Sequence, residues 1–199
     1  MSGIIAQNSG RHTGLVKASS GGGGVWNLIE TQTASSDSTL DFTSGIDSTY
    51  AEYVFKWINI HPATDGAFFQ INFRDGSSAY DATKTSTAFE AYHLESGDTA
   101  LGYKGANDVA QGTGVQRISA QLGNDNDQDA CGYLHLFNPS STTFIKPYKS
   151  RTIHNAQEDY AEDHYIAGYC NVTAAIDGVQ FSMSSGNIDA GTISLYGIS

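Results

Sequence analysis

Charged residues are scarce in this chain: Asp, Glu, Lys and Arg together make up 16% of its 199 residues. Ten of these residues are basic and 21 are acidic, which gives a net charge of −11 at pH 7. A general nucleic-acid binder neutralises phosphates with clustered Lys and Arg, and ten scattered basic residues do not supply such a cluster. The composition therefore excludes nucleic acid as a general partner.

Long apolar runs are also missing. Because no stretch of 18 apolar residues occurs, we expect no membrane-spanning helix, and without a basic segment before an apolar one we expect no secretory signal. The two cysteines, Cys131 and Cys170, are too few for a disulfide framework and too far apart for a local metal clip. Synthesis in a reducing cytosol favours two buried free thiols, with a single bridge between them as the alternative.

Motifs for catalysis and metal binding are absent as well. The chain has no GxSxG elbow, no phosphate-binding glycine loop, no HExxH and no Cys-x-x-Cys. None of the six histidines forms a pair at ligand spacing, so we expect no zinc site, no cofactor and no enzyme activity. His154, Asp163 and His164 fall in a polar stretch that we interpret as solvated. Distant paired carboxylates for glycoside cleavage leave no local mark and stay open.

The chain is rich in glycine and aromatic residues, with 22 Gly, 11 Tyr and 9 Phe. This combination is typical of short strands joined by tight turns, whereas long helices use more Ala, Glu, Lys and Leu. A chain of this length buries roughly 70% of its unfolded surface in one domain without a disulfide or a metal. Roughly nine or ten short alternating segments predict a mainly β, antiparallel two-sheet sandwich of jelly-roll type.

The clearest strand signals come in two places. Residues 177–198 alternate on both sides of a Ser/Gly/Asn break, which predicts an antiparallel pair that closes the sheet system. Residues 53–60 form the strongest strand, with apolar side chains on both faces as in a covered central strand. Two Asp-Gly turns, at 65–66 and 75–76, bracket an alternating run, so we expect residues 50–74 to form a hairpin.

Two segments have weaker patterns. Residues 87–94 suit a strand or a short helix, and the polar, acidic residues 151–164 suit a long loop or a helical turn. The apolar faces of the clearer strands predict one shared core. Its expected members are Phe55, Trp57, Phe69, Ile71, Phe181, Met183 and Leu195.

Residues 1–24 differ from the β-sandwich domain expected over residues 25–199. They contain no acidic residue, carry +2 from two basic residues, and end in four glycines that make a flexible linker. A disordered tail is one interpretation. The other is an N-terminal arm that becomes ordered on a partner, because a solvated tail has little use for apolar side chains. The candidate partner-binding residues of this arm are Ile4, Ile5, Arg11, Leu15, Val16 and Lys17.

Asp125, Asp127 and Asp129 stand at alternate positions, as the oxygen ligands of a calcium loop do. An EF-hand loop would then need Gly at its sixth position and Glu at its twelfth, where this chain has Ala130 and Leu136. Two interpretations stay open: a weak calcium site of another type, and a solvated turn between strands.

Three segments resemble a known class of proteins. The ending SGNIDAGTISLYGI (185–198), the opening SGIIAQNSGRHTGLVK (2–17) and, more loosely, CGYLHLFNPSSTTFIKPYKS (131–150) are similar to accessory virion structural proteins of tailed bacteriophages, especially marine ones. The resemblance implies a β-sandwich component of a virion. It offers no catalytic motif to transfer to this chain.

From this resemblance we expect an outer capsid decoration (cement) protein, made in the bacterial cytoplasm and fastened by its arm to the major capsid protein or a tail component. The resemblance also implies a homo-oligomer, with a trimer favoured, and low charge suits subunit contacts that bury no unpaired ions. One alternative is a tail-fibre module that recognises a host-surface glycan by stacking loop tyrosines on sugar rings. The other is a polysaccharide hydrolase.

Overall fold

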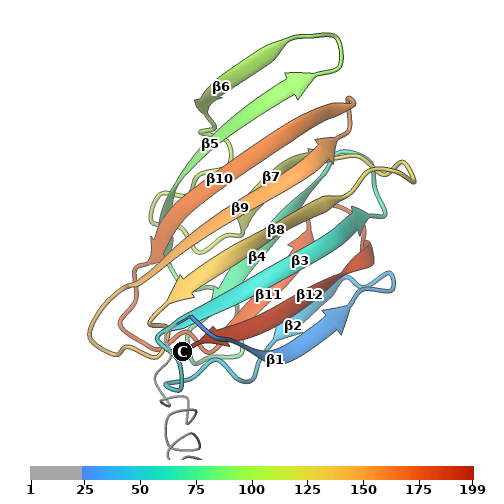
Figure 1. The fold of residues 1–199 in the computed structure, drawn as a ribbon. Coiled ribbons are helices and arrows are strands. Elements are labelled where there is room, and N and C mark those ends of the chain that lie inside the picture. The colour runs from blue at the N-terminus through green and yellow to red at the C-terminus, as the bar shows by residue number, and fades with distance from the viewer. Residues whose placement is uncertain (1–23) are drawn as a thin grey trace, which may run out of the picture.

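Twelve antiparallel strands build the protein in the computed structural model, which describes residues 24–199 (Figure 1). The prediction of an all-β antiparallel chain is confirmed. A helix suited to crossing a lipid bilayer is not found in the described residues. The strands are β1 (Trp26–Thr33), β2 (Thr39–Phe42), β3 (Glu52–Pro62), β4 (Ala67–Arg74), β5 (Lys84–Leu94), β6 (Thr99–Tyr103), β7 (Gln116–Leu122), β8 (Ala130–Phe137), β9 (Lys146–Ala156), β10 (Tyr160–Cys170), β11 (Gly178–Met183) and β12 (Ile188–Ile198).

The strands form one sheet that bends back on itself and nearly closes into a barrel. Its main path runs β1-β12-β3-β8-β9-β7-β4-β11-β2, and β10, β5 and β6 extend it sideways from β9. The front layer therefore has eight strands, in the order β1, β12, β3, β8, β9, β10, β5 and β6. It faces a back layer of β7, β4, β11 and β2 (Figure 1). This arrangement differs from the predicted sandwich, because its layers are not two clearly separate sheets.

The two layers are joined on both sides. At one side, a single pair, Leu122 of β7 with Ala156 of β9, carries the sheet around the bend. At the other side, the Gln32 amide of β1 donates to the Asp41 carbonyl of β2 over 2.9 Å, although these strands form no ladder. The barrel is therefore closed by side chains and by the short link between β1 and β2.

Both predicted local strand pairs are wrong. β3 pairs with β12 and β8, whereas β4 pairs with β7 and β11, so residues 50–74 cross from the front layer to the back. β11 and β12 likewise lie in different layers, and each is flanked by other strands. The reason is that a strand with one apolar face can bury it against the opposite layer as well as beside its neighbour in sequence.

β3 is central, as predicted, but its outer face is covered only in part: Val54 is fully buried there, outside the inner core, whereas Ile58 is not. Ile58 is 47% exposed, whereas Ile60 is fully buried, although the alternation would place both on one face. Between them, Asn59 has a φ of 54° and the register with β8 shifts. Asn tolerates this left-handed conformation, and the resulting bulge turns Ile60 back toward the core.

The polar stretch at residues 151–164 was predicted as a loop or helical turn, and this is wrong. It belongs to a long hairpin in which β9 and β10 pair over eleven positions, with a three-residue turn from 157 to 159. Residues 87–94, which were ambiguous, lie in β5 and pair with β10. The sequence pattern did not indicate strands here because both faces of this hairpin carry polar side chains, so apolar and polar residues do not alternate.

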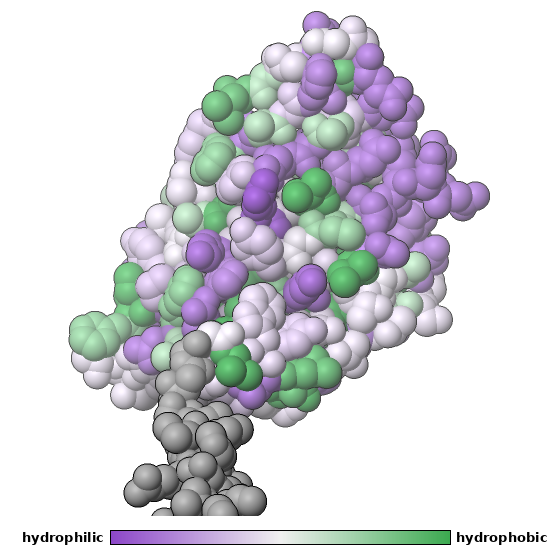
Figure 2. Space-filling view, viewed as in Figure 1, coloured by the Kyte–Doolittle hydropathy of each residue, from purple (hydrophilic) through white to green (hydrophobic). Residues whose placement is uncertain are grey.

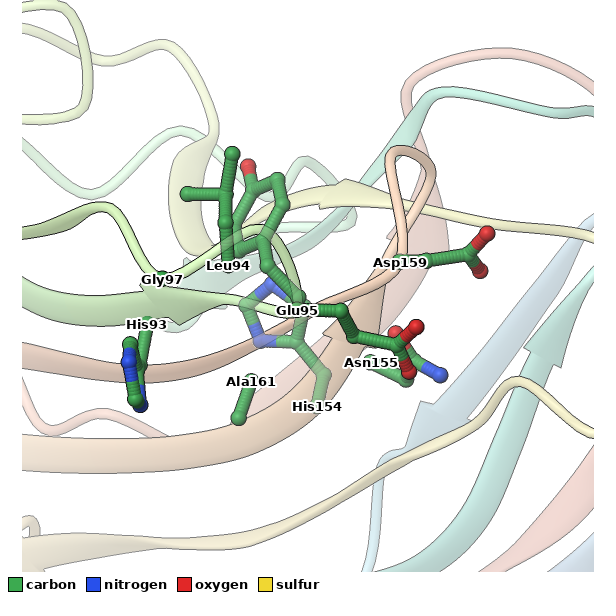
Figure 3. A pocket seen from close by; sticks show the side chains of 9 residues that line it. His93, Leu94, Glu95, Gly97, His154, Asn155, Asp159 and Ala161 are labelled. Carbon is green, nitrogen blue, oxygen red and sulfur yellow. The ribbon is translucent and has the colours of Figure 1, made fainter.

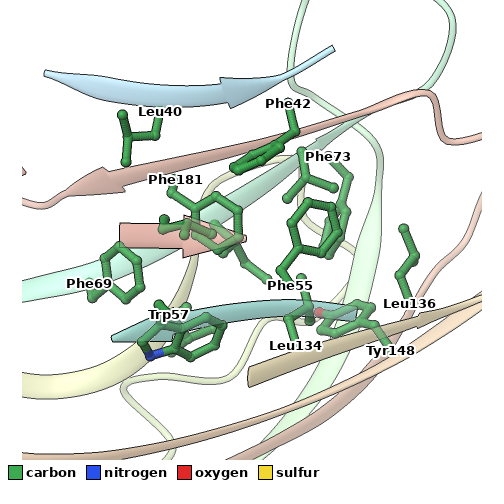
Figure 4. Close-up of a cluster of buried hydrophobic side chains, with 14 of the residues drawn as sticks. Leu40, Phe42, Phe55, Trp57, Phe69, Phe73, Leu134, Leu136, Tyr148 and Phe181 are labelled. Atoms are coloured by element: carbon green, nitrogen blue, oxygen red, sulfur yellow. The ribbon is translucent and has the colours of Figure 1, made fainter. Parts of the chain in front are cut away.

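The predicted core is confirmed, since each of its members is at most 7% exposed. Phe181 of β11 lies at its centre, with ring centroids 5.5 Å from Phe55 and 6.1 Å from Trp57 in the front layer. In the back layer its ring lies 5.9 Å from Phe42 and 5.7 Å from Phe69 (Figure 4). Edge-to-face and offset aromatic pairs of this kind add to the area buried.

The two cysteines carry free thiols, as favoured from the sequence. Cys170 is buried, but Cys131 is partly exposed on the outer face of β8, where its thiol lies 3.5 Å from an Asp129 carboxylate oxygen. The N-terminal arm lies outside the described residues, so its predicted partner-binding residues stay predictions.

We expect Phe181→Ala to lower the free energy of unfolding by about 3–5 kcal/mol, because it removes the ring that both layers contact and leaves a cavity. Urea denaturation followed by circular dichroism measures this change. The matched control is Phe144→Ala: Phe144 is 67% exposed in the loop after β8, and its loss should cost less than about 0.5 kcal/mol. Equal costs for the two variants would contradict the described core.

Candidate functional sites

One cross-strand row of side chains spans the outer face of the front layer. Successive ladder partners connect all eight strands, so the side chains of this outer row stand next to each other. The outer row consists of Thr31, Ser194, Lys56, Tyr133, Arg151, Tyr165, Phe89 and Tyr103. Side chains directly opposite each other on paired strands are close enough to interact, so the row is continuous across the eight strands.

Tyr165 is the centre of the best-ordered part of this row. The Phe89 ring stacks on it with centroids 4.6 Å apart and planes within 5°, and the Arg151 guanidinium lies 5.1 Å from its centroid. Arg151 also makes two charged hydrogen bonds to Asp163, of 2.8 and 2.6 Å, and the Tyr165 hydroxyl donates to Asp163 over 2.7 Å. Phe89 and Arg151 project from the strands on either side of β10, so they contact opposite faces of the Tyr165 ring.

The electrostatics of this network stabilise its charged form. Burial raises the pKa of Asp163, but the hydrogen bonds from Arg151 and Tyr165 outweigh it and leave the pKa below its ordinary value. The hydrogen bond to Asp163 likewise raises the pKa of Arg151. Arg151 and Asp163 therefore stay ionised and paired across the physiological pH range.

Exposed apolar side chains lie beside the outer row. Ile58 is 47% exposed, Ile153 53% and Leu101 75%, and all three belong to the outer face of the front layer. Viewed onto this layer, hydrophobic residues alternate with pale and hydrophilic ones, and hydrophilic residues gather toward one side (Figure 2). Ile58 and Ile153 line one hollow of this face together with Tyr133 and Arg151 of the outer row. Adjoining exposed apolar groups of this kind are typical of a surface that contacts another protein.

The tyrosines considered for glycan stacking do not gather at one loop surface. All but Tyr80 lie in strands: Tyr92 in β5, Tyr103 in β6, Tyr148 in β9 and Tyr160 in β10. Tyr148 is buried, and the rings of Tyr92 and Tyr160 pack together with centroids 5.5 Å apart. Of the five, Tyr103 belongs to the outer row.

The inner face of the same strands holds a group of buried acidic and basic side chains. Glu90 comes from β5, His154 from β9, and Glu162 and His164 from β10; we name these four the Glu/His cluster. The register places Glu162 directly opposite His154 and His164 directly opposite Glu90, all on one face. Each is at most 7% exposed, so charged groups lie where water has little access.

Short distances connect the Glu/His cluster. The Nδ1 of His164 lies 3.0 Å from Oε1 of Glu162 and 3.8 Å from Oε2 of Glu90. The Nε2 of His154 lies 3.7 Å from Oε2 of Glu162. Lys104, which is partly exposed, covers the cluster from the loop after β6 and donates to Oε1 of Glu90 over 2.6 Å.

Several atoms of this cluster have no hydrogen-bond partner. Among residues 24–199, nine buried side-chain nitrogen or oxygen atoms are unpaired, and five of them belong to the cluster or to two residues beside it. The five are Oε2 of Glu90, both ring nitrogens of His154, Oδ1 of Asn107 and Oγ1 of Thr152. Because an unpaired buried polar atom typically costs about 1–3 kcal/mol, their concentration in one place is a local deficit of hydrogen bonds.

Burial sets the protonation of the cluster. It raises the pKa of Glu90, aided by the charge of Glu162 and opposed by Lys104. Burial, together with His164, lowers the pKa of His154 to about 3, so this imidazole is neutral at pH 7. A neutral imidazole keeps one nitrogen lone pair free to accept a proton or bind a metal.

The opposite end of these strands buries two lysines beside Cys170. Lys84 of β5 and Lys146 of β9 are both ladder partners of Cys170 in β10. Unlike the Glu/His cluster, their ammonium groups have acceptors: Lys84 donates to the Ala82 carbonyl over 3.1 Å and Lys146 to the Val172 carbonyl over 2.8 Å. Burial lowers the pKa of Lys84 to about 8 and raises that of the Cys170 thiol to about 12.

Asp125, Asp127 and Asp129 lie in and beside the exposed loop before β8. Asp127 and Asp129 line a cavity of about 540 Å³ together with His61 and Asp189. The three aspartates are not part of the group of metal-ligating side chains found in the described region, which is Glu90, Glu162 and His164. The weak calcium site stays a prediction.

The sequence pattern gave little sign of the Glu/His cluster. Its members come from three strands, and three of them lie within residues 151–164, which were expected to be a loop or helical turn. His154 and His164, which were interpreted as solvated, are buried. One local signal existed: Glu162 and His164 are two residues apart, so in a strand they share a face. Recognising it required knowing that residues 160–170 form a strand.

A scan against protein-family models matched none of them, and a search of the curated proteins found no similar sequence. The function proposed below therefore depends on the geometry of the chain and on the resemblance of its segments.

The two buried lysines lead to a prediction about pH. In the unfolded chain Lys84 has an ordinary pKa of about 10.4, and in the folded protein its pKa is about 8. Between these values the unfolded state binds more protons, so stability rises with pH. We expect the wild type to gain about 2 kcal/mol more than Lys84→Met between pH 7 and pH 10, measured by urea denaturation at both pH values. Parallel pH profiles for the two proteins would contradict the prediction.

Proposed function

We propose that this protein is an accessory structural component of a tailed-phage virion, a capsid decoration (cement) protein on the outer surface of the particle. The outer face of its front layer is the surface that contacts a neighbouring virion protein. The observation that carries the proposal is the outer row with exposed apolar side chains beside it, on a face about eight strands wide. The resemblance of both chain ends to virion proteins supports the same assignment. A jelly-roll type of fold, predicted from the sequence, is part of this proposal.

The composition of this face suits a protein partner. Tyr, Phe and Arg are enriched in the centres of protein interfaces, and the outer row supplies all three. Arg151 is already paired with Asp163, so a partner that covers it does not bury an unpaired charge. Ile58, Ile153 and Leu101 add aliphatic area, which stabilises protein contacts when water is displaced.

The same geometry disfavours the glycan-binding alternative. A sugar ring stacks on the open face of an aromatic side chain. Of the five tyrosines considered for stacking, Tyr148 is buried and the rings of Tyr92 and Tyr160 pack against each other. A polysaccharide hydrolase is disfavoured in turn, because Glu90 and Glu162 are buried and Lys104 already binds Glu90. Its two carboxylates would have to flank a sugar chain that reaches them.

The N-terminal arm completes the proposal. Arg11 and Lys17 are the basic residues of a segment without acidic groups, so an acidic patch on the major capsid protein or a tail component fits them. The arm and the outer face then provide two attachments, and linked contacts raise avidity without new contact area. A homotrimer stays our expectation for the assembly.

The test uses the phage that encodes this chain, grown without the gene on cells that supply the protein from a plasmid. We expect Ile58→Glu combined with Ile153→Glu to lower incorporation into purified virions at least tenfold, because two charges must be desolvated in the interface. Mass spectrometry measures copies of the protein per major capsid protein. The melting temperature of the isolated variant should stay within a few degrees of the wild type, since both residues are exposed.

Phe144→Glu is the control, since it changes a still more exposed apolar residue, which lies in the loop between β8 and β9 and is not part of the outer row. It should be incorporated like the wild type. A wild-type protein missing from purified virions, or a double variant incorporated at the normal level, would contradict the proposal. A copy number of only a few per virion would instead favour the tail-fibre alternative.

A further inference from the structure

The Glu/His cluster differs from the other buried polar groups of the protein. The buried lysines at the opposite end of the same strands donate to carbonyl oxygens, whereas here two carboxylates and two imidazoles converge with several atoms unpaired. We propose that the Glu/His cluster binds one divalent transition-metal ion, with Zn²⁺ the best match, through Glu90, His154, Glu162 and His164. This site is independent of the outer face that carries the proposed function.

The spacing of the ligand atoms fits one ion. Ligands held about 2.0–2.2 Å from a tetrahedral centre lie roughly 3.4 Å from each other. The distances within the Glu/His cluster bracket this value: 3.0 and 3.8 Å from Nδ1 of His164 to the two glutamates, and 3.7 Å from Nε2 of His154 to Glu162. The ligand atoms of Glu90, Glu162 and His164 all lie within 4.8 Å of one another. His154 lies outside this group, so its imidazole has to move closer to complete a four-residue site.

The chemistry of the donors selects the class of metal. Two imidazole nitrogens with two carboxylate oxygens are ligands for Zn²⁺ and similar transition ions, whereas Mg²⁺ and Ca²⁺ prefer oxygen ligands alone. The two carboxylates supply the negative charge that compensates a divalent cation.

The unpaired atoms point to the same ligand. His154 has a fully buried side chain, both of its ring nitrogens are unpaired, and it faces Glu162. Oε2 of Glu90 is also unpaired, while its other oxygen is held by Lys104. A cation between these groups would satisfy His154 and Glu90 together, which no hydrogen-bond donor in the described residues does.

One proposed ligand, His164, also has a polar neighbour at its second ring nitrogen. The Asn107 amide lies 3.3 Å from Nε2 of His164, and its Oδ1 has no partner. The same amide nitrogen donates to the Ser119 carbonyl over 3.2 Å. A metal on Nδ1 of His164 places the imidazole proton at Nε2, and the Asn107 carboxamide would have to turn over for its oxygen to accept that proton. Ligating histidines usually donate their second nitrogen to such an oxygen.

A cavity lies beside one member of the cluster, His154. It has a volume of about 510 Å³, lies between the β5–β6 turn and the β9–β10 turn, and has His154 and Tyr160 in its wall (Figure 3). The ion would enter here and join β5, β9 and β10, where the sheet extends past the barrel. Metal ligation would thus replace the apolar packing that this part of the inner face lacks.

The experiment titrates the full-length, tag-free chain, stripped of metals with a chelator, with Zn²⁺ alone by calorimetry at neutral pH. We expect one ion per chain with a dissociation constant below about 1 µM, a raised melting temperature, and reversal of both by EDTA. Ca²⁺ and Mg²⁺ should bind at least 100-fold more weakly. Co²⁺ should produce the visible absorption of a tetrahedral nitrogen and oxygen site.

Variants locate the site. Glu162→Gln and His164→Gln should each weaken Zn²⁺ binding at least tenfold, and circular dichroism checks that each variant is folded. Glu90→Gln is the second choice if either fails to fold, because Glu90 lies at the rim of the cluster under Lys104. The matched controls are His93→Gln, an exposed histidine beside the cavity, and Asp127→Asn in the exposed loop, which should bind like the wild type.

Three results would overturn the proposal. The first is a folded wild-type chain whose dissociation constant for Zn²⁺ is above about 100 µM, which is as weak as binding to isolated surface histidines. The second is tight binding that Glu162→Gln, His164→Gln and Glu90→Gln leave unchanged. The third is loss of binding in His93→Gln or Asp127→Asn, which would place the ion at the surface.

Discussion

The contact of Phe181 with both layers is the interaction on which the rest of the structure depends. Phe55 and Trp57 approach it from the front layer, and Phe42 and Phe69 from the back. Because this ring packing holds the layers together, successive strands can cross between them, and the sheet needs only one ladder pair to turn the corner from β9 to β7. A hairpin-by-hairpin sheet would leave these rings on an open face.

Beyond the barrel, β10, β5 and β6 have no comparable aromatic core. There the alternation of each strand separates two different chemistries. Outward side chains such as Phe89, Arg151 and Tyr165 form the outer row, whereas inward ones form the Glu/His cluster. Since neighbouring residues of one strand point to opposite faces, β9 and β10 contribute one set of side chains to the candidate interface and the alternate set to the candidate metal site.

Burial of polar groups has different consequences at the two ends of these strands. Lys84 and Lys146 are satisfied by backbone carbonyls, so the cost of burying them appears as a lowered pKa. In the Glu/His cluster burial also shifts the pKa values of Glu90 and His154, and in addition several atoms are left unpaired. A buried site whose own groups do not satisfy each other is the kind of place where a ligand contributes to stability.

The amino-acid sequence alone determined the all-β class, the absence of a disulfide framework and the members of the core, because period-two patterning and composition are local properties. Phe69 and Phe181 could be assigned to the core without knowing their neighbours. Only the tertiary structure decided which strands pair, that the sheet nearly closes, and that Glu90, His154 and Glu162 meet. These outcomes depend on contacts between residues far apart in the chain, and a polar strand with two occupied faces resembles a loop until its partners are known.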